Sequence, residues 1–210
     1  MVGFLLLVDD CSRYMWLQLL TSKDEAAAVI KKFKTRAEAE SGKKLRTLRT
    51  DHGGEFTLVE FAAYCVDQGV VHHHTALYSP QHNGMVERWN QTVVGMARSM
   101  MKAKGMPTRF WGEAVTTTVF ILNRVPTKAL KGVTPFEAWY GHKPSVSFLQ
   151  TFGCISHVRK TKLVLTKLED KSTPIVLLGY EEGTKAYRLY DPRGGKVVVS
   201  RNVVFDEKAA

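Results

Sequence analysis

The pattern of hydrophobic residues changes near Pro144, and this change constrains the fold more than any other feature of the sequence. Before it, short apolar stretches alternate with stretches of helical periodicity, which predicts an α/β sheet with helices on its faces. After it, short β-branched stretches are separated by turn residues, which predicts a small barrel built only from strands. We therefore expect two domains, at residues 1–145 and 150–208.

Individual elements can be assigned from periodicity and from turn residues. Strands of the first domain are expected at residues 2–8, 14–20, 45–51 and 70–75. Its helices are expected at about 22–42, 61–65, 85–104 and 108–124, with a loop at 78–84. In the second domain, strands are expected at 153–160, 175–180, 185–190 and 196–204, and the turn at 191–195 makes the last two a hairpin.

Composition narrows the class of protein. The 210 residues include 30 Lys and Arg against 20 Asp and Glu, a formal net charge of +10, and 44% are hydrophobic. This composition excludes a disordered chain, and the charge favours a polyanionic partner such as nucleic acid without requiring one. The longest apolar run, Val2–Val8, is far shorter than the roughly 20 residues of a membrane span. Three scattered cysteines indicate neither a disulfide framework nor a zinc site, so we expect an intracellular protein that is neither secreted nor bound to a membrane.

Two carboxylates occupy positions suited to chemistry. Asp51 comes at the C-terminal end of an expected strand, where α/β sheets usually display active groups. Glu87 is expected on the first turn of a long helix, directly after a loop. A strand-end aspartate and a helix-borne glutamate can converge on one divalent metal ion. Taken singly, each has a structural alternative: Asp51 as a turn residue, and Glu87 as an acid favoured by the helix dipole.

Both carboxylates lie in longer motifs. Residues 50–56 (TDHGGEF) and 78–88 (YSPQHNGMVER) resemble the second and third acidic motifs of retroviral-type integrases. Four further segments are similar to the integrase of copia-type LTR retrotransposon polyproteins, and together the motifs cover nearly the whole chain. These segments are residues 8–13 (VDDCSR), 123–126 (NRVP), 134–139 (TPFEAW) and 152–154 (FGC).

The resemblance implies a ribonuclease-H-like mixed sheet with helices on both faces, followed by an SH3-like barrel. It implies that Asp51 and Glu87 are catalytic ligands of Mg²⁺ or Mn²⁺, and that DNA is the substrate, whose 3′ ends are processed and then joined to target DNA. The family acts as homo-oligomers in the nucleus. Residues around Glu87 then become candidates for DNA contact, although a solvated helix face would have the same composition: Gln81, Asn83, Gly84 (as a hinge), Arg88 and Gln91.

The resemblance places the first acidic residue of the catalytic triad on a strand upstream of Val2–Val8. We therefore expect this chain to lack the first, central strand of the sheet, and with it the carboxylate that bridges two metal ions and supports strand transfer. The strands that would flank it should either pair with each other or leave the domain unstable. Asp9 and Asp10 are weak candidates to replace the missing ligand, because they occupy the turn between two expected strands, and a turn stabilised by Asp10 and Arg13 explains them better.

Two other functions stay open. One is a catalytically inactive nucleic-acid-binding or assembly module derived from a retrotransposon. The other is a ribonuclease-H-type nuclease, which the position of Glu87 on a helix disfavours. The run His72-His73-His74 is not expected to bind a metal, because successive strand residues face opposite sides. Large aromatic residues are expected in the core: Phe110, Trp111, Phe120 and Trp139.

Overall fold

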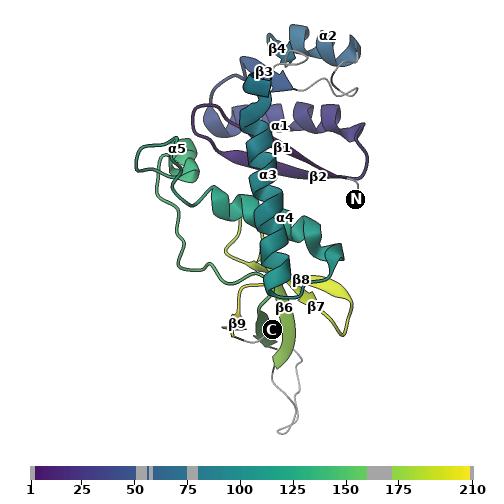
Figure 1. The fold of residues 1–210 in the computed structure, drawn as a ribbon, viewed down its shortest axis with the longest axis vertical. Coiled ribbons are helices and arrows are strands. Elements are labelled where there is room, and N and C mark those ends of the chain that lie inside the picture. The colour runs from purple at the N-terminus through teal and green to yellow at the C-terminus, as the bar shows by residue number, and fades with distance from the viewer. Residues whose placement is uncertain (1–2, 51–55, 57–58, 75–79, 160–171, 209–210) are drawn as a thin grey trace. The chain divides into compact units, whose positions relative to one another are not determined.

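The structure of the chain is a computed structural model that describes residues 3–50, 56, 59–74, 80–159 and 172–208 (Figure 1). Two compact units make up the chain. The first comprises Met1–Gln91 and Pro126–His142, and the second comprises Thr92–Val125 and Lys143–Ala210. This division is made by spatial contact, so the sequence boundary between residues 145 and 150 stays a prediction.

The first unit begins with an antiparallel hairpin of β1 (Gly3–Val8) and β2 (Met15–Leu20), whose register pairs Gly3 with Leu20 and Val8 with Met15. The turn closes because Asp9 Oδ2 accepts hydrogen bonds from the backbone N–H and the hydroxyl of Ser12, both at 2.7 Å. These two strands agree with the sequence expectation.

A separate parallel pair is formed by β3 (Thr47–Thr50) and β4 (Val71–His74). Helices α1 (Glu25–Ser41) and α2 (Val59–Asp67) share one core cluster with β2, through Leu20, and with β3, through Leu48. Among the described residues, β1 pairs only with β2 and β3 only with β4. The direct pairing of β1 with β3, one of the two expected outcomes, is therefore not seen in that part of the chain. The buried members of the shared cluster are Leu20, Ala26, Ile30, Phe56, Phe61, Cys65 and Val70.

Helix α3 (Pro80–Ala103) starts earlier than its apolar pattern predicts. Residues 80–84 of the loop expected at 78–84 are therefore helical, and the expected helix start at Met85 is wrong; residues 78 and 79 lie outside the described part of the chain. Proline suits the first turn of a helix, since its fixed φ is already helical and its missing N–H would have had no acceptor there. Further along, Val93 and Ala97 are both buried, because residues four apart lie on the same face of a helix.

Short helix α5 (Pro135–Tyr140) completes the first unit. Its N-terminus is capped by Thr134, whose hydroxyl accepts a hydrogen bond from the Glu137 N–H at 3.1 Å. Trp139 meets Trp16 of β2 edge to face, with ring centroids 4.7 Å apart. Both indoles are half-buried, so Trp139 holds α5 against β2 within an aromatic cluster rather than in a fully buried core.

The second unit contains a five-stranded antiparallel sheet in the order β8-β7-β6-β5-β9. Strands β8 and β9 lie at opposite ends of this order, yet only Arg201 and Asn202 separate them in the chain. The sheet must therefore curl until its ends meet, which makes a small barrel. The single strand expected at 196–204 is accordingly split in two. The strands are β5 (Ile155–Arg159), β6 (Ser172–Tyr180), β7 (Tyr187–Asp191), β8 (Lys196–Ser200) and β9 (Val203–Asp206).

The 3-10 helix η2 (Thr108–Phe110) leads into α4 (Trp111–Leu122), which packs on β6. Glu113 of α4 accepts two hydrogen bonds from the Arg188 guanidinium, at 2.8 and 3.1 Å, and these bonds raise the pKa of Arg188. Phe120 stacks on Tyr180 with ring centroids 4.6 Å apart. Helix α4 and the barrel are therefore one packed body. No helix in the described part of the chain combines the length and apolar character of a membrane span.

Candidate functional site

Asp51 directly follows the C-terminal end of β3. Because β3 and β4 run parallel, with Thr50 opposite His74, this end is the edge at which α/β folds usually display their active groups. The hydroxyl of Thr50 forms a hydrogen bond of 2.9 Å with Nε2 of His72, which ties the last residue of β3 to the neighbouring strand. Asp51 itself lies outside the described residues, so the structure defines the strand from which it emerges.

Glu87 lies about two turns into α3 rather than on its first turn, because the helix begins at Pro80. This placement does not support the helix-dipole explanation for Glu87. The helix dipole favours acidic residues only within the first turn, so it offers little reason for an acid at this depth. The side chain is exposed and therefore open to a ligand.

The candidate DNA contacts share this helix. Arg88 and Gln91 are exposed, and Gln91 lies on the same helix face as Glu87 because residues four apart are neighbours on a helix. Arg88 Nε donates to the carbonyl of Gly84 at 3.0 Å. Gly84 is thus a helical residue rather than the expected hinge in a loop. Gln81 and Asn83 belong to the first turns of α3, and their side chains lie outside the described part of the structure.

Asp10 is held by two arginines. Its carboxylate accepts from Arg13 Nη1 at 2.8 Å and lies 3.9 Å from Arg49 Nη1. A metal ion at Asp10 would compete with both guanidinium groups. Asp9, in turn, is engaged by Ser12. The contacts of both residues therefore favour the interpretation that they stabilise the β1–β2 turn.

The donor chemistry suits a hard divalent ion. Asp51 and Glu87 carry carboxylate oxygens, the type of ligand that Mg²⁺ prefers, and Glu87 is exposed to the water that Mg²⁺ usually retains. Among the residues that the structure describes, no group of three His, Cys, Asp or Glu side chains is placed to hold a metal ion. In the histidine run, His72 bonds to Thr50 and its ring meets Phe61 edge to face at 5.3 Å.

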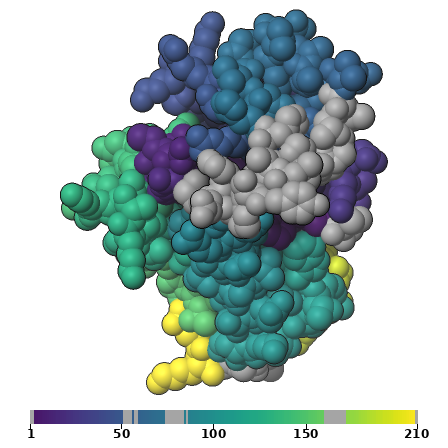
Figure 2. Space-filling model, turned by 45° about the horizontal axis from the view of Figure 1, so that its top comes forward, coloured from purple at the N-terminus to yellow at the C-terminus, as the bar shows by residue number. Residues whose placement is uncertain are grey.

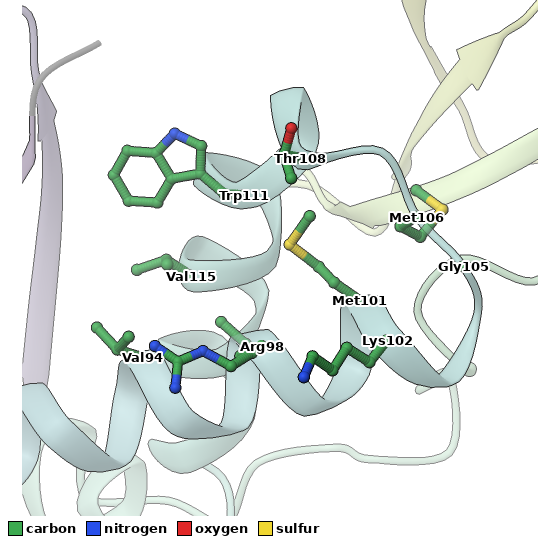
Figure 3. A pocket seen from close by; sticks show the side chains of 10 residues that line it. Val94, Arg98, Met101, Lys102, Gly105, Met106, Thr108, Trp111 and Val115 are labelled. Atoms are coloured by element: carbon green, nitrogen blue, oxygen red, sulfur yellow. The ribbon is translucent and has the colours of Figure 1, made fainter.

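The structure contains a cleft in the second unit that the sequence did not predict. Trp111 is expected in the core, but the structure places it half-buried at a cleft of about 590 Å³ between α3 and the η2–α4 segment (Figure 3). In the sequence, the cleft corresponds to two apolar residues seven positions apart on α3, Val94 and Met101, with the exposed Arg98 between them. Phe110, by contrast, is buried as expected.

Two family models match the chain. The model described as an integrase core domain matches residues 2–80, and the model described as a retroviral polymerase SH3-like domain matches residues 154–210.

Curated relatives align over nearly the whole chain. It is 43% identical over 204 residues to the retrovirus-related Pol polyprotein from transposon TNT 1-94 of Nicotiana tabacum. It is 31% identical over 205 residues to the corresponding polyprotein from transposon RE2 of Arabidopsis thaliana. The alignments cover 97% and 98% of this chain but only 15% and 14% of the relatives. The chain thus spans a small part of the polyproteins it matches.

A solved structure is similar in fold. The simian T-cell lymphotropic virus intasome in complex with PP2A regulatory subunit B56 gamma contains a chain with a TM-score of 0.53 and 15% identity. The match covers 93% of this chain and 68% of that one. It confirms the expected fold class, a ribonuclease-H-like α/β core followed by an SH3-like β domain.

Proposed function

Because the chain carries an integrase core domain and an SH3-like retroviral polymerase domain, and its homologues include plant retrotransposon Pol polyproteins, we propose that it serves DNA integration. The proposed reaction is metal-dependent processing of DNA 3′ ends and their transfer to target DNA. The observation that carries the proposal is the exposed Glu87 well inside α3, together with the second acidic motif, whose Asp51 directly follows β3.

In this proposal, Asp51 and Glu87 hold Mg²⁺ or Mn²⁺. When bound, such ions supply activation of the attacking hydroxyl and stabilisation of the leaving oxygen at phosphorus. Arg88 and Gln91 contact the DNA backbone beside Glu87, because both are exposed on the same part of α3. The active form is a homo-oligomer on DNA.

Metal binding is the direct test of the two carboxylates. Calorimetric titration of the full chain with Mn²⁺ should show binding that is lost in both Asp51→Asn and Glu87→Gln. Each substitution removes the negative charge while keeping the size of the side chain. Glu60→Gln is the matched control, since Glu60 is also an exposed helical acid but lies in α2. Wild-type Mn²⁺ affinity in both variants would refute the assignment.

A catalytically inactive nucleic-acid-binding module is the second candidate. The contacts of Asp10 favour it. Because Arg13 and Arg49 engage the Asp10 carboxylate, Asp10 is a poor replacement for the third metal ligand, and the candidate ligands are then Asp51 and Glu87 alone. An oligonucleotide strand-transfer assay with Mn²⁺ separates the two functions. Product that disappears in Asp51→Asn supports integration. DNA binding without product supports the inactive module. In that case, Arg88→Gln should reduce the slope of log K for DNA against log salt concentration by about 1, and the control Lys32→Gln should leave this slope unchanged.

A further inference from the structure

The cleft of the second unit lies between the C-terminal half of α3 and the η2–α4 segment, and every described residue that lines it belongs to that unit (Figure 3). Its volume of about 590 Å³ falls within the range of roughly 300–1,000 Å³ that is usual for ligand pockets. Ala97 and Val115 in the lining are buried, whereas Met101 and Trp111 remain partly in solvent.

The lining is suited to holding apolar side chains from a partner. Val94 presents an aliphatic group and Met101 a thioether, and methionine adapts its shape to different partners. Figure 3 shows Met101 reaching from α3 into the space below Thr108, with Trp111 and Val115 extending from α4. In the space-filling view, the stretch of chain that contains these two helices is coloured teal (Figure 2). Val94, Met101 and Trp111 are half-buried, so apolar side chains of a docked partner would cover what they leave exposed.

Charge on the rim restricts what can occupy the cleft. Arg98 and Lys102 are both exposed and lie four residues apart on α3, so they stand one helical turn apart along one side of the cleft. None of the described lining residues is acidic. A complementary ligand therefore has an apolar ridge with negative groups beside it, spaced by about one helical turn.

The length of the cleft fits a short helix. From Val94 to Gly105, α3 and its C-terminal end extend about 16 Å, which matches roughly three turns of a partner helix. A nucleobase fits less well, because the neutral polar groups of the described lining are the Thr108 hydroxyl and the Trp111 indole N–H, too few to pair the polar edges of a buried base. We propose that this cleft binds a short amphipathic helix of a protein partner, with its apolar residues in the cleft and its acidic residues on Arg98 and Lys102.

A selection on the full chain tests this binding mode. The probe is a displayed library of helix-forming peptides of about 14 residues, long enough to cover the groove. Enriched peptides should carry apolar anchors at i, i+4 and i+7 beside Asp or Glu, the pattern of helix-in-groove recognition. Affinity of the enriched peptide is then measured by fluorescence anisotropy.

Charge reversal provides the decisive comparison. Arg98→Glu combined with Lys102→Glu should weaken the selected acidic peptide about tenfold or more, and a peptide whose acids are replaced by lysine should recover binding to this variant. Arg193→Glu with Arg201→Glu makes the same change in net charge at exposed positions outside the cleft, and should leave affinity unchanged.

Three outcomes would overturn the proposal. The first is a selection that enriches no helical peptide, or one whose enriched peptide binds the wild type and the charge-reversed variant at Arg98 and Lys102 with equal affinity. The second is displacement of the peptide by a single-stranded oligonucleotide, which would assign the cleft to nucleic acid. The third is concentration-dependent dimerisation that the reversal abolishes, which would assign it to a second copy of the chain. None of these results bears on Asp51 or Glu87, so the proposed function is tested separately.

Discussion

Replacing Gly179 with alanine tests whether α4 and the barrel are packed as one body. A Cβ at this position would lie 2.4 Å from Oγ1 of Thr117 on α4. That hydroxyl cannot easily move, because it is buried and donates to the carbonyl of Leu178 at 2.9 Å. Gly179 also has a φ of +148°, a backbone conformation that side chains rarely adopt.

The expected cost has two parts. Forcing a methyl group into this packed contact costs about 1–3 kcal/mol, and the unfavourable φ adds about 1–2 kcal/mol. We therefore expect Gly179→Ala to lower the free energy of unfolding of the second unit by about 3 kcal/mol, a large share of the roughly 5–15 kcal/mol of a typical domain.

The measurement is urea unfolding of the full chain, followed by hydrogen exchange at the amides of β6 and β7. Gly183→Ala is the matched control, since Gly183 also has a positive φ of +73° but a Cβ there would meet nothing within 4 Å. It should lose only the conformational part, about 1 kcal/mol. In the double variant Gly179→Ala with Thr117→Ala, removal of Oγ1 should recover about 1–2 kcal/mol relative to the sum of the single changes.

Two results would refute this reasoning. If Gly179→Ala costs no more than Gly183→Ala, the close approach of α4 to β6 is not present in solution. If the effects at Gly179 and Thr117 are additive, the two residues do not meet.

Two further predictions concern the other contacts of each unit. Burial raises the pKa of Tyr180 from 10 to about 12, so the folded state holds this proton more tightly, and the stability it contributes is present below pH 10 and lost as the pH rises through 12. Tyr180→Phe should therefore reduce the fall of the urea midpoint between pH 10 and pH 12. At neutral pH, its free energy of unfolding should be lower by about 1 kcal/mol, because the hydrogen bonds to Gln150 are lost. If the urea midpoint falls as steeply with pH in the variant, the assignment is contradicted. In the first unit, Thr134→Ala should destabilise α5 by about 1 kcal/mol and speed hydrogen exchange at Glu137, whereas Thr134→Ser should not; equal exchange rates in the two variants would argue against the cap.

Elements governed by near neighbours could be predicted from the sequence. The turn at Asp191–Gly195 joins β7 to β8 in register, with Asp191 opposite Lys196, as its turn residues indicate. The β1–β2 hairpin follows in the same way from two apolar stretches and a short polar turn. Errors arose where one pattern permits two structures. Pro80 is as compatible with the first turn of a helix as with a loop, and in the structure it begins α3.

Long-range pairing could not be predicted. The break between β8 and β9 at Arg201 and Asn202 arises because β9 turns away to pair with β5, about 50 residues earlier, and no local signal marks that bend. The contact of Glu113 with Arg188 likewise joins residues 75 apart. For the candidate site, motifs identified Asp51 and Glu87, but the depth of Glu87 within α3 came only from the structure.

By itself, the sequence determined which carboxylates are candidates for chemistry, the class of each domain and most strand and helix positions, because these depend on residue type and short-range periodicity. Only the tertiary structure decided that α4 packs on the barrel, that Arg49 lies beside Asp10, and that α3 and α4 leave an apolar cleft with a basic rim. These features depend on which surfaces meet after the chain folds. Pairs of residues far apart in the chain set that packing, and their spacing leaves no periodic mark in the sequence.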